Sequence, residues 1–338
     1  MVAMMKLSLR AIKPLLVCAF VTLTIACSDA TKPFAATPTR DGTAVPAAPG
    51  SPSTFKVAVV LKSFTNPFFV EMAKGARQAQ AETGIELEIK TSTPDTSAEQ
   101  QIRLVNSQIK AGVNAIVISP VDTRLLVPAM KAAHDAGIKI VNIDERLNAE
   151  ALTANGLYLV PYVGVDSEQG AYQAAKFIAD KIGHPTEVAI VGGIPGTATA
   201  IERQQGAQRA FQEEALLRLV PAGAANWKAD EAYELARRLF KAHPRIGAVY
   251  CANDLMAIGV IKYLQESRNS KVLVGGFDAL EEARGAIRAG QMAVTVDQRA
   301  AQQGYLGVTS ALKLLRGEAV PKVLLVETQL VSAGGLNP

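Results

Sequence analysis

Polar side chains with several hydrogen-bonding atoms follow most of the apolar, strand-like runs in this 338-residue sequence. The run "KVAVVL" leads to a lysine and an asparagine, and "IVNI" leads to two adjacent carboxylates. Each of these groups can make several hydrogen bonds, and no cysteine or histidine stands among them. The inventory predicts a site that grips a neutral polyol and argues against a metal ligand set or a nucleophile. The residues concerned are Lys62, Asn66, Asp144, Glu145, Asn253, Asp254, Asp278, Asp297 and Gln298.

The common catalytic motifs do not occur in this sequence. The stretch "GGIPGT" (192–197) lacks the lysine of a phosphate-binding loop, and no G-x-S-x-G elbow is found. His134, His184 and His243 lie in predicted helix ends or turns, away from any partner at ligand spacing. We therefore expect neither an enzyme nor a cofactor. Glycosidase chemistry by two strand-end carboxylates stays as an alternative, because sequence does not give their separation.

The elements that must position these residues alternate between two kinds from residue 55 onward. Short β-rich apolar runs are followed by longer amphipathic stretches at a spacing of about 25–30 residues, which is typical of βαβ units with parallel sheets. In such sheets ligands bind beyond the carboxyl ends of the strands, where the polar residues fall. Strands are expected at 55–61, 85–89, 115–119, 138–143, 187–191, 247–251, 271–277, 292–296 and 323–327. Helices are expected from Asn66-Pro67 and at 97–111, 124–136, 168–182, 201–215, 229–242, 254–266 and 300–316.

Each candidate residue also has a simpler interpretation when taken alone. Asn66 and Asp254 could be helix N-caps, and Lys62 could be an ordinary surface charge. Arg203 could lie on a helix surface, and Trp227 could be a hydrophobic staple in front of a helix. The case for a common site rests on their joint position, because independent loop residues would not repeatedly gather at the same ends of strands.

The first 54 residues read as export and attachment signals. Lys6, Arg10 and Lys13 precede the uncharged apolar run 15–27, which is shorter than the roughly 20 residues of a membrane span and has the anatomy of a secretory signal. The run ends in "LTIAC", which resembles the lipobox of bacterial lipoproteins, with Cys27 as the lipidated residue; ordinary cleavage and a free soluble protein is the alternative. Residues 28–54 hold five prolines and read as a tether.

Composition excludes several classes of function. The formal net charge of +4 is spread without basic blocks, so nothing indicates nucleic-acid binding. Of the three cysteines, Cys18 lies in the signal and Cys27 at its end. Only Cys251 is left in the globular part, which excludes a disulfide within it and a metal cluster built on cysteine.

Residues from about 55 to 335 resemble bacterial periplasmic sugar-binding proteins of the ribose/galactose class, the receptors of ABC transporters, and most of all their allose-type members. The matching motifs are "VVLKSFTNPFFVEM", "KIVNIDERL", "AVYCANDLMAIGV", "VLVGGFDALEEAR" and "AGQMAVTVDQ". LacI-type repressors share the fold, but their N-terminal helix-turn-helix has no counterpart here, so we do not expect a repressor.

The resemblance implies which residues bind the ligand. In the family, the segment matching 62–69 supplies a polar group, an asparagine and two aromatic residues. Lys62 is shared with the allose type, where the ribose type has serine, and Glu145 stands where the ribose type has arginine. Aromatic side chains would pack on the apolar faces of the sugar while the polar groups bond its hydroxyls. The implied set is Lys62, Asn66, Phe68, Phe69, Asp144, Glu145, Arg203, Trp227, Asn253, Asp278 and Gln298.

The resemblance also implies the architecture: two Rossmann-like, doubly wound parallel-sheet α/β domains joined by a three-crossing hinge, as in periplasmic binding proteins of type I. The chain would cross near 163–166, 297–300 and 327–329, and the domains would close on the ligand. The expected division is a signal at 1–27, a tether at 28–54, an N-terminal lobe at 55–164 plus 299–327, and a C-terminal lobe at 165–298 plus 328–338.

The expected function is that of a monomeric, non-catalytic receptor in the periplasm or cell envelope, lipid-anchored at Cys27. It would bind a monosaccharide, with an allose-like aldohexopyranose favoured by Lys62 and Glu145, and deliver it to an ABC transporter permease. A pentose or polyol ligand is an alternative. So is a sugar or sugar-like signal receptor that docks on a membrane sensor. The binding of nucleic acid is not expected.

Overall fold

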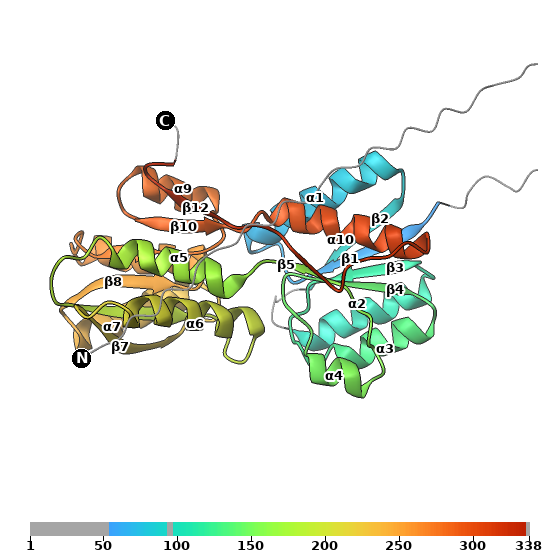
Figure 1. The fold of residues 1–338 in the computed structure, drawn as a ribbon, viewed down its shortest axis with the longest axis horizontal. Helices are drawn as coiled ribbons and strands as arrows, with labels where there is room; N and C mark the ends of the chain where they lie inside the picture. The colour runs from blue at the N-terminus through green and yellow to red at the C-terminus, as the bar shows by residue number, and fades with distance from the viewer. Residues whose placement is uncertain (1–53, 93–96, 336–338) are drawn as a thin grey trace, which may run out of the picture. The chain divides into compact units, whose positions relative to one another are not determined.

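The computed structural model describes residues 54–92 and 97–335, and these described residues belong to one compact unit. The predicted signal, Cys27 and almost all of the tether lie outside the described residues. Two six-stranded sheets, each with its own helices, make up the described part (Figure 1).

The first sheet is wholly parallel, with the strand order β11-β5-β4-β3-β1-β2. Helix α10 comes from far along the chain and packs against α1, β3 and β4. The elements of this first domain are β1 (Lys56–Leu61), α1 (Pro67–Thr83), β2 (Glu86–Thr91), α2 (Ala98–Lys110), β3 (Ala115–Ile118), α3 (Val127–Asp135), β4 (Lys139–Ile143), α4 (Ala149–Ala154), β5 (Tyr162–Gly164), α10 (Ala300–Leu315) and β11 (Val323–Leu325).

The second sheet has the strand order β12-β10-β9-β8-β6-β7 and is parallel except for β12, which runs antiparallel to β10. The elements of this second domain are α5 (Ser167–Ala179), β6 (Thr186–Gly192), α6 (Ala198–Gln212), β7 (Leu217–Ala224), α7 (Ala229–Ala242), β8 (Ile246–Cys251), α8 (Asp254–Glu266), β9 (Leu273–Gly275), α9 (Glu281–Arg288), β10 (Val294–Asp297) and β12 (Gln329–Ser332). The chain passes between the domains at 165–166, 298–299 and 326–328, the three crossings of the hinge.

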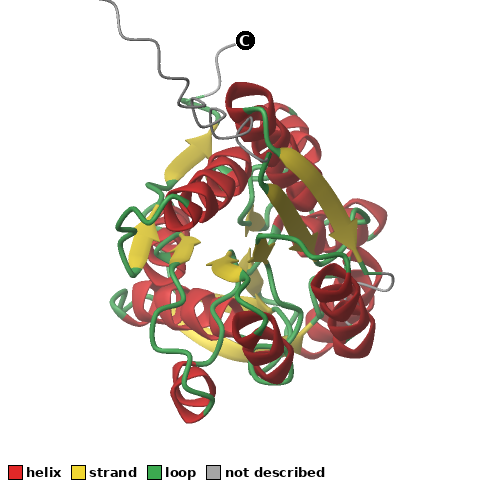
Figure 2. Cartoon of the chain, turned by 90° about the vertical axis from the view of Figure 1, so that its right-hand side faces the viewer, coloured by secondary structure: helices red, strands yellow, loops and turns green. Residues whose placement is uncertain are grey.

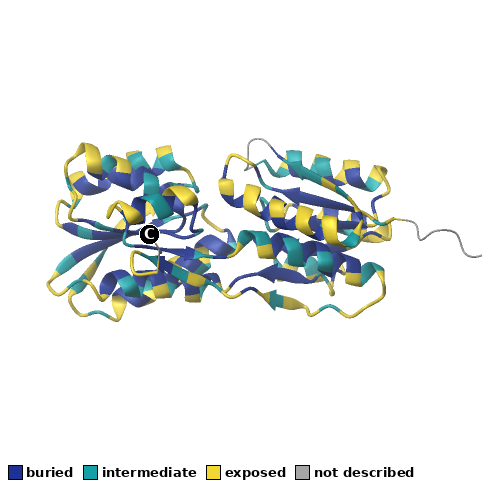
Figure 3. Cartoon of the chain, turned by 90° about the horizontal axis from the view of Figure 1, so that it is seen from above, coloured by how far each residue is buried: buried dark blue, intermediate teal, exposed yellow. Residues whose placement is uncertain are grey.

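The uninterrupted apolar runs of the central strands are explained by helices on both faces of each sheet (Figure 2). Along β1, Val57, Val59 and Leu61 belong to one hydrophobic core, whereas Ala58 and Val60 belong to another. Successive strand residues point to opposite faces, so both sets are buried. The central strands are accordingly the most buried elements, and the outer faces of the helices are exposed (Figure 3).

The fold class and all nine expected strands are confirmed, as are the expected helices. Five elements were not predicted from the sequence, namely β5, β7, β12, α4 and α9. Strand β7 contains Pro221 and Gly223, two residue types that argue against a strand interior. The sheet tolerates them because β7 is an edge strand. The others are short, with three to eight residues each, and carry too few turns of a periodic pattern to be recognised.

Gly304→Ala is expected to destabilise the protein by about 1–3 kcal/mol, because α1 and α10 are in backbone contact at this point. A Cβ atom on Gly304 would lie 2.0 Å from the carbonyl oxygen of Met72, and one on Gly75 would lie 1.7 Å from that of Ala301. Urea unfolding should show a lower midpoint with an unchanged slope. The matched control is Gly285→Ala in α9, where a Cβ meets no atom within 4 Å. An unchanged midpoint for Gly304→Ala would contradict the close approach.

Candidate functional site

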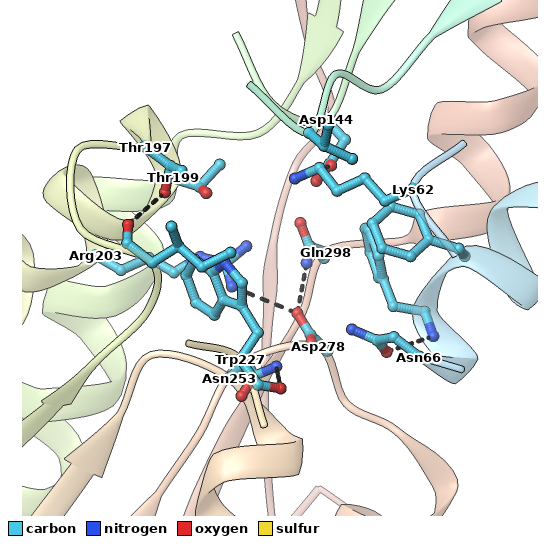
Figure 4. A pocket seen from close by; sticks show the side chains of 14 residues that line it. Lys62, Asn66, Asp144, Thr197, Thr199, Arg203, Trp227, Asn253, Asp278 and Gln298 are labelled. Carbon is cyan, nitrogen blue, oxygen red and sulfur yellow. Dashed lines mark hydrogen bonds and ion pairs between the residues drawn. The ribbon is translucent and has the colours of Figure 1, made fainter. Parts of the chain in front are cut away.

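A cavity lies between the carboxyl ends of the two sheets, with about 570 Å³ of empty space, part of it open to solvent. Ten of the eleven residues predicted to bind ligand line it, together with four that the sequence did not indicate (Figure 4). The lining consists of Lys62, Asn66, Phe68, Phe69, Val121, Asp144, Ile194, Thr197, Thr199, Arg203, Trp227, Asn253, Asp278 and Gln298.

Lys62 and Asp144 form the charged part of the first domain's wall. Lys62 follows β1 and Asp144 follows β4, and Lys62 Nζ lies 3.3 Å from Asp144 Oδ2. Burial alone would lower the pKa of Lys62, but the Asp144 and Glu145 carboxylates outweigh it and hold this pKa above its ordinary value. Ser119 Oγ donates a hydrogen bond of 2.6 Å to the same Asp144 oxygen. Lys62 is therefore a largely buried ammonium ion, with 15% of its side chain exposed, and not an ordinary surface charge.

The start of α1 supplies an amide and two aromatic rings. Asn66 caps the helix, because its Oδ1 accepts a hydrogen bond from Phe68 N at 3.0 Å, and Asn66 also lines the cavity. Phe68 and Phe69 are 3% and 5% exposed, and their rings meet edge to face with centroids 5.1 Å apart. Both rings belong to the hydrophobic core of the domain and both line the cavity. The adjacent phenylalanines thus form one rigid apolar wall.

Arg203 and Asp278 dominate the second domain's wall. Arg203 is 4% exposed, its Nη1 donates to the Ala252 carbonyl at 2.8 Å, and the same atom lies 3.5 Å from Asp278 Oδ1. Its Cζ lies 3.8 Å from the centroid of the Phe277 ring, which holds the guanidinium plane. Arg203 Nε is buried and has no hydrogen-bond partner among the described residues. A buried donor without a partner is costly unless a ligand satisfies it.

Amide side chains and the tryptophan complete this wall. Gln298 Nε2 donates to Asp278 Oδ1 at 2.6 Å, and Asn253 caps α8 by accepting from Met256 N at 2.9 Å. The cap of α8 is therefore Asn253 and not Asp254, which is fully buried beneath the site and accepts hydrogen bonds from Thr295 and Leu280. Trp227 lines the cavity in front of α7.

The backbone is strained at three of the lining residues. Asp144, Trp227 and Asp278 have φ angles of 63°, 67° and 121°, in the region that favours glycine. Such conformations cost about 1–3 kcal/mol each and concentrate at functional sites. At Asp144 the strained peptide is held by Tyr162, whose hydroxyl donates to the Asp144 carbonyl at 2.7 Å. The two acidic side chains are thus aimed into the cavity at a cost in stability.

Glu145 is the one predicted ligand residue that the cavity lining, which lies entirely in the described part, does not include. Its side chain is fully buried and turns toward the start of α6 in the second domain. The sequence did not indicate Val121, Ile194, Thr197 and Thr199. Val121 and Ile194 also follow strands, β3 and β6, but they are apolar, and Thr197 and Thr199 lie at the start of α6, so none of the four stands out as a polar strand-end group. The stretch "GGIPGT", rejected as a phosphate loop, supplies two of them.

Among the described residues, no group of three or more His, Cys, Asp or Glu side chains is placed to hold a metal ion. Among these residues there is also no helix with the length and apolarity needed to cross a bilayer. The arrangement instead offers hydrogen bonds of both kinds, charged groups of both signs and apolar ring faces.

The thermal stability of the ligand-free protein is expected to fall as the pH rises from about 5 to about 9. Burial raises the pKa of Asp278 to about 8, although the Arg203 charge opposes this. An unfolded aspartate has a pKa of about 4, so between these values the folded state holds a proton that the unfolded chain has lost, and stability decreases with pH. Asp278→Asn should flatten this slope in melting curves at pH 5, 7 and 9. The variant should keep the pH dependence at the lower pH values, because burial raises the pKa of Asp254 to about 6 and Asp254 is unchanged. An equal slope in the variant would contradict the assignment.

The fold and the cavity together define a two-domain α/β binding protein with its site at the domain boundary. The chain belongs to the periplasmic binding protein family, since the family model of a periplasmic binding protein domain matches residues 57–319.

Within this family, the chain is similar to several proteins that are named for the sugar they bind. A D-ribose/D-allose-binding protein of Pseudomonas aeruginosa is 34% identical over 271 residues, covering 79% of this chain and 84% of that protein. The D-allose-binding periplasmic protein of Escherichia coli is 33% identical over 283 residues, covering 81% and 91%. An ABC transporter periplasmic solute-binding protein from Actinobacillus succinogenes, solved with bound D-allose, has a TM-score of 0.80 and 34% identity, covering 83% of this chain and 98% of that one.

Proposed function

We propose that this protein is a non-catalytic receptor that binds one monosaccharide between its two domains, with an allose-like aldohexopyranose favoured, and delivers it to an ABC transporter permease. The single observation that carries the proposal is the composition of the cavity wall. Each domain contributes one basic and one acidic side chain, Lys62 with Asp144 and Arg203 with Asp278, and aromatic rings line the same cavity.

This wall fits the two kinds of surface on a pyranose. The hydroxyl groups around the edge of the sugar ring meet Asp144, Asp278, Arg203, Asn253 and Gln298, and charged partners give the stronger hydrogen bonds. The apolar C–H faces meet the rings of Phe68, Phe69 and Trp227. A site built to bond particular hydroxyl groups rejects an epimer strongly, because its own buried polar groups would be left unpaired.

The names of the relatives support the proposal that the ligand is a monosaccharide of the allose type. Two of them are named for D-allose, one of these for D-ribose as well, and the related solved structure holds D-allose. Lys62 and Glu145 match the allose-type pattern. We assign Lys62, Asn66, Phe68, Phe69, Asp144, Arg203, Trp227, Asn253, Asp278 and Gln298 to the ligand-binding site.

Transport follows from closure of the two domains. We take residues 55–164 plus 299–327 as the first lobe and 165–298 plus 328–338 as the second. A sugar that contacts both lobes stabilises the closed form, in proportion to its difference in affinity for the closed and open forms. The closed form would then be the one that a permease recognises.

The placement of the protein in the envelope is a further part of the proposal. We propose that the chain is exported as a monomer and anchored by a lipid at Cys27, with residues 28–54 as the tether. The support is the lipobox-like "LTIAC" sequence at the end of an apolar run. The mass of the N-terminal peptide of the protein purified from membranes tests the lipid, and an unmodified cysteine would contradict it.

A thermal-shift panel of aldohexoses, ketohexoses, pentoses and polyols tests the proposed function. We expect D-allose to raise the melting temperature by several degrees, because a ligand at 1,000 times its Kd stabilises by about 4 kcal/mol. D-Glucose, which differs from D-allose at one hydroxyl, should have a much smaller effect. A larger shift with a pentose or polyol would reassign the ligand, and the absence of any shift across the panel would contradict sugar binding.

A further inference from the structure

Glu145 makes its hydrogen bonds across the domain boundary. It follows β4 in the first domain and is completely buried. Its Oε1 accepts from Ala198 N at 2.7 Å and from Thr199 N at 3.2 Å, and its Oε2 accepts from Thr199 Oγ1 at 2.6 Å. All three donors belong to the start of α6 in the second domain. On its own side, Lys62 Nζ lies 3.5 Å away.

The start of α6 needs an outside partner. The first N–H groups of a helix have no acceptor within the helix, and an N-cap side chain usually supplies one. The N-cap residue of α6, Thr197, makes no capping hydrogen bond with its side chain, and its hydroxyl donates to the Ile194 carbonyl instead, as far as the described residues show. Helices α5 and α8 of the same domain are capped by their own Asp166 and Asn253.

A carboxylate suits this position, because the N-terminus of a helix carries a partial positive charge that stabilises an anion. Glu145 therefore acts as the N-cap of α6 from the opposite domain. This cap exists only while the two domains are in contact, and in an open form both the carboxylate and the first N–H groups of α6 would face water.

We infer that Glu145 is a positioning residue that fastens the two domains together in the closed form by capping α6, and that it does not itself touch the sugar. The inference rests on the proposed function. The neighbouring residue Asp144 contacts the sugar instead, since Asp144 lines the cavity and Glu145 does not. One loop after β4 would thus supply a group that selects the ligand and a group that holds the closed form.

We call this contact between Glu145 and the start of α6 the latch. Its loss should have an effect that the loss of a sugar-binding residue would not have. The latch favours closure by the same factor whatever sugar is bound, so its loss lowers every affinity equally, because the apparent affinity depends on how readily the binding-competent form is reached. A residue that bonds a particular hydroxyl would instead change affinities by different factors for sugars that differ at that hydroxyl.

The test compares affinities and dissociation rates of D-allose, its epimers and D-ribose for the wild type, Glu145→Ala, Thr199→Val and the double variant. Fluorescence of Trp227, the single tryptophan, follows binding by stopped flow. We expect Glu145→Ala to lower every measurable affinity by one common factor of about 10–100, through faster dissociation with little change in association. Thr199→Val should cost less, and the double variant no more than Glu145→Ala alone.

Two controls separate this role from others. Glu150→Ala removes a carboxylate of the same domain whose side chain is 83% exposed, and it should leave all affinities unchanged. The melting temperature of sugar-free Glu145→Ala should equal that of the wild type, whereas a merely structural residue would lower it.

Each unfavourable result has a different meaning. Factors that differ between epimers would overturn the latch and make Glu145 a sugar ligand. Affinities equal to those of the wild type, or additive losses in the double variant, would also overturn it. A wild type that responds to none of the sugars would overturn the proposed function, and the latch with it.

Discussion

Asp278→Ala is expected to abolish sugar binding, with a loss of at least about 1,000-fold in affinity, or about 4 kcal/mol. The carboxylate lies between Arg203 and Gln298 and is almost completely buried, so hydroxyl groups that it accepts from would be left unpaired in a closed cavity. A buried polar group left without a hydrogen-bond partner costs about 1–3 kcal/mol, and both oxygens of the Asp278 carboxyl group can bond the sugar. Calorimetric titration of the sugar found by the panel measures the loss.

The fold should survive this change. Burial raises the pKa of the Asp278 carboxyl group, so keeping this group in the folded protein costs free energy at neutral pH, and the alanine variant is free of that cost. Asp180→Ala is the matched control, because Asp180 lies in the same domain with its side chain 58% exposed and far from the cavity lining. Wild-type affinity in Asp278→Ala would remove Asp278 from the site.

Asp144→Ala is expected to have an effect of similar size, from the opposite domain. Its carboxylate accepts a hydrogen bond from Ser119 and lies beside Lys62, so the change deprives the sugar of an acceptor and Lys62 of one of its two carboxylate neighbours. We expect a loss of at least about 1,000-fold, together with a lower pKa for Lys62. The same titration measures the affinity.

The pair of variants tests whether both domains grip the sugar. Asp135→Ala, in α3 of the first domain and with its side chain 56% exposed, is the matched control for Asp144→Ala. A strong loss in one domain's variant with near-normal affinity in the other's would mean that the sugar binds to a single domain, and closure would then need another explanation.

Much of the fold could be predicted because its signals are local and repeated. The runs of valine and isoleucine that form β1, β3 and β4 are apolar at every position, since two cores cover the two faces. Strands that depend on their neighbours were not recognisable. Strand β12 is four residues long and pairs antiparallel with β10, which only the return of the chain across the hinge explains.

The site residues that could be predicted from the sequence are mainly those at the carboxyl ends of strands. Lys62 and Asp144 directly follow β1 and β4, Asp278 comes three residues after β9, and the parallel sheets bring these ends together. Thr199 and Ile194 were missed because their place depends on how the loop before α6 meets the other domain. The direction in which Glu145 points was hidden for the same reason, since two adjacent carboxylates give no sign of which one faces the cavity.

Titration calorimetry of the wild-type protein with D-allose, repeated with Asp278→Ala, tests the central proposal most directly. We expect saturable binding of one sugar per chain to the wild type and no measurable heat with the variant. Failure of the wild type to bind D-allose or any other monosaccharide or polyol of the panel, or equal binding by Asp278→Ala, would contradict it.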